Sequence, residues 1–173
     1  MKFKNEEQKI AIEKLGCLIK IIGSNKVARV RTVEHALLKL KPAIDLDQVE
    51  IFFRNDEPVG YVAWGLLTNR SLSSLSSVAS VLHPSDWNEG DTPCILDLIL
   101  PIGSIYSYKH QIYEILSKSN NYFAWFRQGR RNETFLFVKK IDGATLYAGK
   151  LNEWTGQPFV DSPTDLPTDF RTS

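Results

Sequence analysis

The chain has 173 residues, of which 43% are apolar and 11% aromatic, and its formal net charge is +1. This length and apolar content are typical of one globular domain with its own core, and they exclude a largely disordered chain. The near-neutral charge gives no argument for a nucleic-acid partner or an anionic membrane. The polar N-terminal segment MKFKNEEQK carries acids and does not resemble a signal or transit peptide, so we expect a cytoplasmic protein.

Apolar runs and cysteine spacing exclude two further classes. The longest apolar stretches are interrupted by Lys20 or Asp97 and fall short of the ~20 residues that span a bilayer, so no transmembrane segment is expected. Cys17 and Cys94 lie far apart and form no CxxC or Cys/His spacing. They are therefore predicted to be reduced, buried thiols, and no metal-ligand set is present.

Two helices are predicted in the first 41 residues. Residues 5–22 carry an apolar stripe at helical spacing, made of Ile12, Leu15, Ile19 and Ile22. Gly23-Ser24-Asn25 predicts the end of this helix. A second helix is expected over residues 32–41, with Thr32 as its N-cap and with four inward-facing residues, Val33, Ala36, Leu37 and Leu40.

A hairpin and a short helix are predicted next. Residues 49–53 and 59–66 are rich in β-formers, and Asn55-Asp56-Glu57-Pro58 supplies the turn between them. A serine-rich stretch then carries leucine and alanine at spacings of three and four: Leu72, Leu75, Ala79 and Leu82. This spacing favours an amphipathic helix that stops at Pro84, although a serine run also fits a linker.

The remaining chain predicts a mixed α/β (α+β) sheet in a single domain over residues 1–156. A buried strand around residues 94–100 is followed by a helix over 105–117 and by strands over 122–126, 134–140 and 145–151, with Asp142-Gly143 as the last hairpin turn. Residues 157–173 are rich in Pro, Asp and Thr and are expected to form a disordered tail.

Asp97 is the most unusual residue of the chain, because it lies at the centre of the apolar run CILDLILP. A buried carboxylate is costly unless it is neutralised, hydrogen-bonded or paired. Asp97 is therefore either a structural acid bonded to neighbouring backbone amides or part of a working site. The chemistry of the run alone favours neither alternative.

Two blocks of the sequence carry a family resemblance. The first spans residues 42–64 and contributes Pro42, Ala43, Ile44, Gln48, Asp56, Pro58, Val59, Tyr61 and Trp64. The second spans residues 86–103 and contributes Asp86, Trp87, Gly90, Asp91, Asp97, Pro101 and Gly103. Both blocks resemble the RTX toxin-activating lysine acyltransferases, also called hemolysin-activating proteins. Weaker matches extend the resemblance to about residues 15–157, at Phe123, Ala124, Arg127, Gly149, Lys150, Glu153 and Trp154.

The resemblance implies a cytoplasmic enzyme of GNAT-like fold that takes a fatty acyl group from acyl carrier protein. It would place this group on internal lysines of a large secreted RTX-type toxin or adhesin, with no bound cofactor. The family uses a histidine and an aspartate as its catalytic pair, and the aspartate falls on Asp97. The resemblance therefore favours an active-site origin for this acid.

The family histidine is missing from this chain. Gapless counts backward from Pro42 and forward from Leu15 both place its position at Ala28. A lysine amine, with a pKa near ~10.4, must lose a proton before it attacks a thioester, and a positioned base contributes about 10²–10⁴-fold. An enzyme with this loss should be slow. His35 is the best candidate for a substitute base, whereas His83 and His110 are interpreted as ordinary surface or helix histidines.

Two further groups of residues are candidates for substrate contacts. The basic segment 127–131 contains Arg127, Arg130 and Arg131, which form either a charged hairpin turn or a docking patch for an acidic acyl carrier protein. A strand-like segment follows it, so it does not fit the loop that holds the CoA pyrophosphate in GNAT acetyltransferases. Tyr61 and Trp64 are predicted to share one aromatic face of their strand, which either packing or an acyl pocket would explain.

An acyltransferase is therefore the leading hypothesis. The alternative is a pseudoenzyme of the same fold that acts as a binding protein, a chaperone or a regulator of a toxin or adhesin, and Ala28 favours this alternative. A CoA-dependent acetyltransferase is a third, weaker hypothesis. The serines of residues 71–77 lack a GxSxG motif, which argues against a hydrolase. The sequence does not distinguish a monomer from a homodimer.

Overall fold

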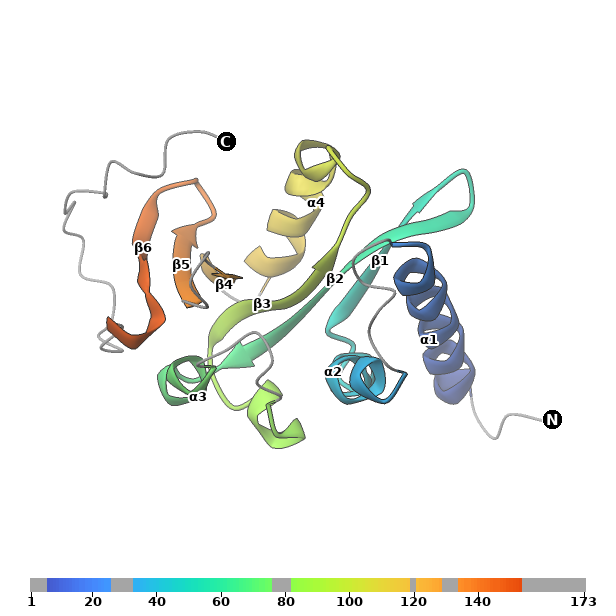
Figure 1. The fold of residues 1–173 in the computed structure, drawn as a ribbon, viewed down its shortest axis with the longest axis horizontal. Helices are drawn as coiled ribbons and strands as arrows, with labels where there is room; N and C mark the ends of the chain where they lie inside the picture. Colours follow the sequence, from blue (N-terminus) through green and yellow to red (C-terminus); the bar gives the residue numbers. More distant parts are fainter. Residues whose placement is uncertain (1–5, 26–32, 76–81, 119–120, 129–133, 154–173) are drawn as a thin grey trace.

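One six-stranded sheet organises the molecule in the computed structural model, which describes residues 6–25, 33–75, 82–118, 121–128 and 134–153 (Figure 1). The strands follow one another across the sheet in chain order: β1 (Val49–Arg54), β2 (Glu57–Leu67), β3 (Thr92–Ile99), β4 (Tyr122–Gln128), β5 (Thr134–Lys140) and β6 (Thr145–Lys150). Neighbouring strands are antiparallel, except that β3 and β4 are parallel. The predicted mixed α/β single domain is confirmed.

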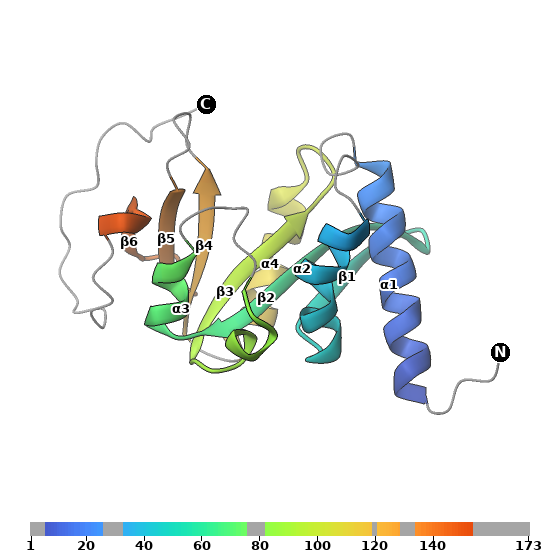
Figure 2. The same ribbon diagram turned by 60° about the horizontal axis from the view of Figure 1, so that its bottom comes forward.

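Helices cover both faces of the sheet (Figures 1 and 2). One face packs against α1 (Glu6–Ser24), α2 (Val33–Asp45) and α3 (Asn69–Ser74), and we call it the α1–α2 face. The other packs against α4 (Ile105–Ser117) and is called the α4 face. The crossover from β3 through α4 to β4 places α4 on one face, because parallel neighbouring strands require such a connection.

Helix α1 is present as predicted, but of its predicted apolar stripe only Ile22 is buried. Ile12 and Ile19 are 50% and 48% exposed, and the other buried residues are Leu18 and Ile21. All three buried residues lie in the second half of the helix, where it packs on the sheet. Because Ile19 is exposed in this same half, the face that packs is rotated from most of the predicted stripe.

Helix α2 continues four residues past its predicted end at Lys41 and includes Pro42. Proline lacks the N–H that would bond the carbonyl four residues earlier, so it usually ends or kinks a helix. Packing of Leu40 and Ala43 in the core accompanies this extension of the helix. Thr32, the predicted N-cap, lies outside the described residues.

The first hairpin has a tighter turn than predicted. Only Asn55 and Asp56 form the turn, with φ of 50° and 61°, and Glu57 already belongs to β2. Positive φ at both central residues is the signature of the two-residue type I′ turn, for which Asn and Asp are suited. The predicted Asp142-Gly143 turn is also present, with Gly143 at φ 100°.

Helix α3 ends at Ser74 and not at the predicted Pro84, and it begins at Asn69 because Thr68 caps it. The Thr68 hydroxyl accepts a hydrogen bond from the Ser71 backbone N–H at 3.1 Å. Leu72 and Leu75 are buried as predicted, and so is Leu82, which precedes the short 3-10 helix η2 (Pro84–Trp87). Ala79 lies outside the described residues.

Helix α4 has the predicted bounds, and the turn before it depends on Gly103. Gly103 has φ 78°, a left-handed conformation that suits glycine. The last described element is the 3-10 helix η3 (Leu151–Glu153), and residues 157–173 lie outside the described part. Among the helices described, none combines the length and the apolar run that crossing a bilayer requires.

Candidate functional site

Asp97 and Tyr61 meet on the α1–α2 face of the sheet. They come from the neighbouring strands β3 and β2, in which Ala63 pairs with Asp97 and Tyr61 pairs with Ile99. The Tyr61 hydroxyl donates a hydrogen bond to Asp97 Oδ2 at 2.8 Å. Tyr61 is completely buried, in the same cluster as Ile21 and Ile22 of α1.

A β-bulge at Leu96 determines which face Asp97 occupies. The pairing of β2 with β3 shifts between Ala63 and Trp64, so that Leu96 has no partner across the pair. Side chains alternate between faces along a strand, and one extra residue shifts this alternation. Asp97 therefore joins Tyr61 on the α1–α2 face, although regular alternation from Ile95 would have placed it on the α4 face.

The surroundings of Asp97 differ from those expected of an acid in a continuous apolar core. Its side chain is only partly buried, because the face that it occupies is not fully covered at this position. Besides the bond from Tyr61, its Oδ1 accepts a hydrogen bond from the backbone N–H of Leu98 at 3.1 Å. The bond from the neighbouring Leu98 amide agrees with a structural role for Asp97. The partial exposure of its side chain agrees with a role in a working site.

The two sequence blocks that carry the family resemblance are neighbours in space. The first forms the end of α2 with β1 and β2, and the second forms η2 and β3. Gln48 joins them, because its Nε2 donates to Asn88 Oδ1 at 3.1 Å. Within the first block, its backbone carbonyl accepts from the Trp64 N–H at 3.0 Å. The blocks thus build the part of the sheet that positions Asp97.

Tyr61 and Trp64 do not share a face, so this prediction was wrong. Tyr61 belongs to the core cluster beneath α1 and α2, whereas Trp64 packs against the cluster beneath α4. They are three positions apart on β2, and strand alternation sends residues an odd number of positions apart to opposite faces. One pocket lined by both side chains on one face is therefore not formed.

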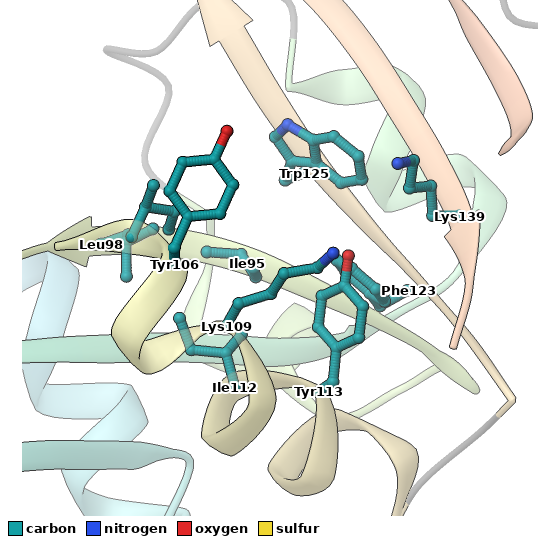
Figure 3. Close-up of a pocket in the computed structure, with 10 residues that line it drawn as sticks. Ile95, Leu98, Tyr106, Lys109, Ile112, Tyr113, Phe123, Trp125 and Lys139 are labelled. Atoms are coloured by element: carbon teal, nitrogen blue, oxygen red, sulfur yellow. The ribbon is translucent and has the colours of Figure 1, made fainter. Parts of the chain in front are cut away.

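A cavity of about 340 Å³ lies on the α4 face, and neither Tyr61 nor Trp64 lines it (Figure 3). Helix α4 contributes Tyr106, Lys109, Ile112 and Tyr113 to its wall. The sheet contributes the opposite wall from three strands, with Ile95, Leu98, Phe123, Trp125 and Lys139. Its lining is mostly apolar, as in sites that hold small organic ligands.

The structure does not bring a histidine to Asp97 within its described residues. Ala28 lies outside them, in the connection between α1 and α2. His35 lies in the first turn of α2, but its side chain is not described, so its role as substitute base stays a prediction. His83 is exposed and its ring accepts from the Ser85 N–H, and His110 is exposed on α4, on the opposite face from Asp97.

The basic residues predicted to bind the donor are described only in part. Arg127 is exposed near the end of β4, two residues after Trp125 and hence on the α4 face. Arg130 and Arg131 lie outside the described residues. In the part of the chain that the structure describes, no group of three His, Cys, Asp or Glu side chains could hold a metal ion.

Both cysteines are free, but only one is buried as predicted. Cys94 is completely buried in β3, and burial raises the pKa of its thiol. A thiol with a raised pKa stays protonated and is a poor nucleophile. Cys17 is only half-buried in α1, so its predicted burial was wrong in degree.

Comparison with known proteins gives a consistent set of relatives. The model of the HlyC family, described as the RTX toxin acyltransferase family, matches residues 6–141. A leukotoxin-activating lysine-acyltransferase from a Pasteurella haemolytica-like species (strain 5943B) is 31% identical over 100 residues, which cover 51% of this chain and 61% of the relative. An RTX-III toxin-activating lysine-acyltransferase from Actinobacillus pleuropneumoniae is 25% identical over 126 residues, covering 69% and 64%.

A protein-lysine myristoyltransferase from Escherichia coli is 25% identical over 146 residues, which cover 84% of this chain and 74% of the relative. For the leukotoxin-activating and RTX-III toxin-activating relatives, the match spans just under two thirds of the relative's own length.

Proposed function

The chain belongs to the RTX toxin acyltransferase family, and from this premise we propose that it transfers a fatty acyl group to a lysine side chain of an RTX-type toxin or adhesin. The proposed donor is a fatty acyl thioester of acyl carrier protein, and the proposed location is the cytoplasm. Relatives named as lysine acyltransferases and as a protein-lysine myristoyltransferase support this assignment.

One observation in the structure carries the proposal: the hydrogen-bonded pair of Tyr61 and Asp97. A carboxylate held by a fully buried tyrosine hydroxyl and by the Leu98 backbone N–H has a fixed orientation while remaining partly accessible. Fixed orientation is what a group needs to direct a reacting amine, since misplacement by about 1 Å can cost 10²-fold in rate.

The reaction itself forms one bond and breaks one. The neutral lysine nitrogen attacks the thioester carbonyl carbon, and the electron pair moves onto the carbonyl oxygen. Collapse of this tetrahedral adduct breaks the carbon–sulfur bond and expels the thiolate. The nitrogen loses one proton in forming the amide and the thiolate takes up one, so that the sum is amide plus free thiol.

In this scheme Asp97 binds the attacking amine and accepts or relays the proton that it loses. Its Oδ2 accepts a hydrogen bond from the Tyr61 hydroxyl and its Oδ1 accepts one from the Leu98 backbone N–H, and these bonds orient the carboxylate for the amine. Tyr61 acts on Asp97 and not on the substrate, so it is a positioning residue. Without a histidine at position 28, proton removal depends on Asp97, on water or on His35, and we expect a slow enzyme.

The α4 face would receive the donor. Lys109, Arg127 and Lys139 lie on this face and give it positive charge. Opposite charge on an acidic carrier protein would steer their encounter and weaken with added salt. Arg130 and Arg131 lie outside the described residues and are retained as donor-binding candidates from the sequence alone.

The test is acyl transfer from acyl carrier protein loaded with a C14 chain, measured by release of free thiol and by the mass of an acceptor peptide containing lysine. We expect transfer by the wild type and a loss of about 10²-fold or more in Asp97→Asn, which keeps the size of the side chain but loses its charge. Glu50→Gln, at an exposed acid on β1, is the matched control. Equal rates for Asp97→Asn and the wild type would overturn the assignment of the site.

The second candidate function is a pseudoenzyme that binds a toxin or adhesin without modifying it. Alanine at the family's histidine position favours this alternative. Ala28→His distinguishes the two: an inert wild type together with a gain of transfer in Ala28→His supports the pseudoenzyme. Transfer by the wild type that Asp97→Asn abolishes supports the enzyme.

A further inference from the structure

The cavity on the α4 face takes no part in positioning Asp97, and its wall has the character of a binding site for a chain-like apolar ligand. Phe123, Trp125 and Phe137 form a row of stacked rings along this face, with ring centroids 5.5 Å and 5.1 Å apart. Ile112 closes the cavity on the helix side and is 3% exposed. A volume of about 340 Å³ falls within the range of pockets that hold small ligands.

Two lysines add positive charge to this apolar wall. Lys109 comes from α4 and Lys139 from β5, so they approach the cavity from the helix and from the sheet (Figure 3). Neither forms an ion pair with a carboxylate of the described residues. The Lys109 ammonium instead lies 5.2 Å from the centroid of the Tyr113 ring. A ligand that complements this wall combines a hydrocarbon part with an anionic end.

The cavity opens beside an exposed apolar segment. Ile105 and Tyr106, in the first turn of α4, line it and are 46% and 86% exposed. Ile102, in the preceding turn, is fully exposed. Exposed apolar side chains at the rim of a cavity would let a hydrocarbon chain enter without crossing a polar surface.

The sheet also provides a connection between this cavity and Asp97. Strands β3 and β4 pair only at Cys94 with Ala124 and at Ile95 with Trp125, and beyond these pairs they diverge (Figure 2). Leu98, which lines the cavity, follows Asp97 directly on the diverging part of β3. The cavity and the carboxylate thus lie on the two faces of the sheet at the place where its strands separate.

We propose that the α4-face cavity binds the hydrocarbon chain of the fatty acyl donor, with Lys109 and Lys139 facing the acidic carrier protein to which the uncharged thioester joins this chain. This inference rests on the proposed function for the identity of the ligand, but it assigns the chain to a different face from the reacting lysine. The acyl pocket is thus assigned to residues that line one cavity, in place of the predicted pair Tyr61 and Trp64.

The first test measures binding of free fatty acids of 8 to 14 carbons to the purified protein by calorimetry. Each further methylene buried in the cavity should raise the affinity about fourfold, until the cavity is filled. Leu98→Trp and Ile105→Trp each place a larger side chain in the cavity from a partly exposed position, and each should weaken myristate binding at least tenfold. Leu38→Trp, at a 53% exposed position of α2, is the matched control. Unchanged binding by both blocking variants would overturn the proposal.

The second test addresses the lysines. Replacing Lys109 and Lys139 together by Gln should weaken binding of myristoyl acyl carrier protein about tenfold while leaving binding of the uncharged tetradecanol unchanged. Lys118→Gln, an exposed lysine just after α4, should affect neither ligand. Equal losses for the carrier protein and the alcohol would contradict a role of the lysines in binding the acidic carrier.

The proposed function and the cavity can fail separately. Asp97→Asn should bind myristate like the wild type, because its side chain lies on the opposite face. If the wild type binds myristate but transfers no acyl group, the cavity's role in binding the chain stands and the proposed acyl transfer is overturned. If Leu98→Trp and Ile105→Trp transfer acyl groups at the wild-type rate and with the wild-type preference for chain length, the proposed function stands and the proposed role of the cavity is overturned.

Discussion

The two faces of the same strands differ in what they offer a substrate. The α1–α2 face presents the carboxylate of Asp97, bonded to a buried tyrosine and to a backbone amide. The α4 face presents a cavity of about 340 Å³ with aromatic walls and two lysines. Asp97 and Leu98 are adjacent in the chain but belong to opposite faces, so one strand can serve a polar reaction and hold an apolar chain.

The difference between the faces is created by one unpaired residue. Every substitution on a strand leaves the alternation of side chains intact, but the bulge at Leu96 reverses it for the residues that follow. If Leu96 were instead paired in a regular strand, Asp97 would lie against the apolar wall, where a carboxylate is costly. The chemistry of this site is thus specified by backbone register as much as by residue type.

Deleting Leu98 should break the comparison most severely, because Ile99 would then follow Asp97 directly and move to the α4 face. Ile99 is 6% exposed in the core cluster of the α1–α2 face, and loss of one large apolar side chain from a core costs about 2–5 kcal/mol. We expect the free energy of unfolding, measured with urea, to fall by at least that amount. Deleting Leu96 is the matched control: Ile95 and Asp97 already have adjacent partners on β2, so they would pair regularly, keep their faces and lose less stability. Equal losses in the two variants would show that strand register does not determine the two faces.

Truncating Ile22 tests the helix that covers the α1–α2 face. Ile22 is 7% exposed in the cluster that contains Tyr61, so Ile22→Ala should lower the free energy of unfolding by about 2–5 kcal/mol. Ile19→Ala is the matched control, because Ile19 is 48% exposed on the same helix and should change stability by about 0.5 kcal/mol or less. Equal losses would mean that α1 packs through the stripe predicted from sequence.

Tyr61→Phe should give the smallest effect on stability. It removes only the hydroxyl that donates to Asp97, and since the carboxylate is partly exposed, water can replace this bond at a cost of about 1 kcal/mol. Acyl transfer should fall more than stability suggests, by about tenfold, because the orientation of Asp97 loosens. Tyr106→Phe, at an 86% exposed tyrosine, controls for removal of a hydroxyl in the stability measurement. A loss of stability without any change in the transfer rate would assign Tyr61 a purely structural role.

The elements that sequence predicted well have local causes. The predicted range of helix α4 is correct, because Gly103 forms the turn before it and the apolar spacing within it is helical. The first hairpin follows from two β-rich segments on either side of residues that tolerate positive φ. In both cases the signal lies within a few residues of the feature that it determines.

The errors have non-local causes. The phase of α1 depends on where the sheet supplies a surface, and the length of α2 depends on packing after Pro42. The bulge depends on how β2 and β3 pair, which no residue in CILDLILP reveals. Asp97 was found through its apolar neighbours and the family resemblance, but its bond to Tyr61 could not be predicted without the register.

The short parallel contact between β3 and β4 has a consequence for how the chain folds. On either side of it lie three strands joined by antiparallel pairings, β1 to β3 and β4 to β6. In each group, hairpins pair strands that are near each other in sequence, so that only short loops have to be closed. The parallel contact spans only two residue pairs and needs the longer connection through α4. We expect it to be the last part of the sheet to assemble, so that the place where β3 and β4 separate, between Asp97 and the cavity, also reaches its native structure last.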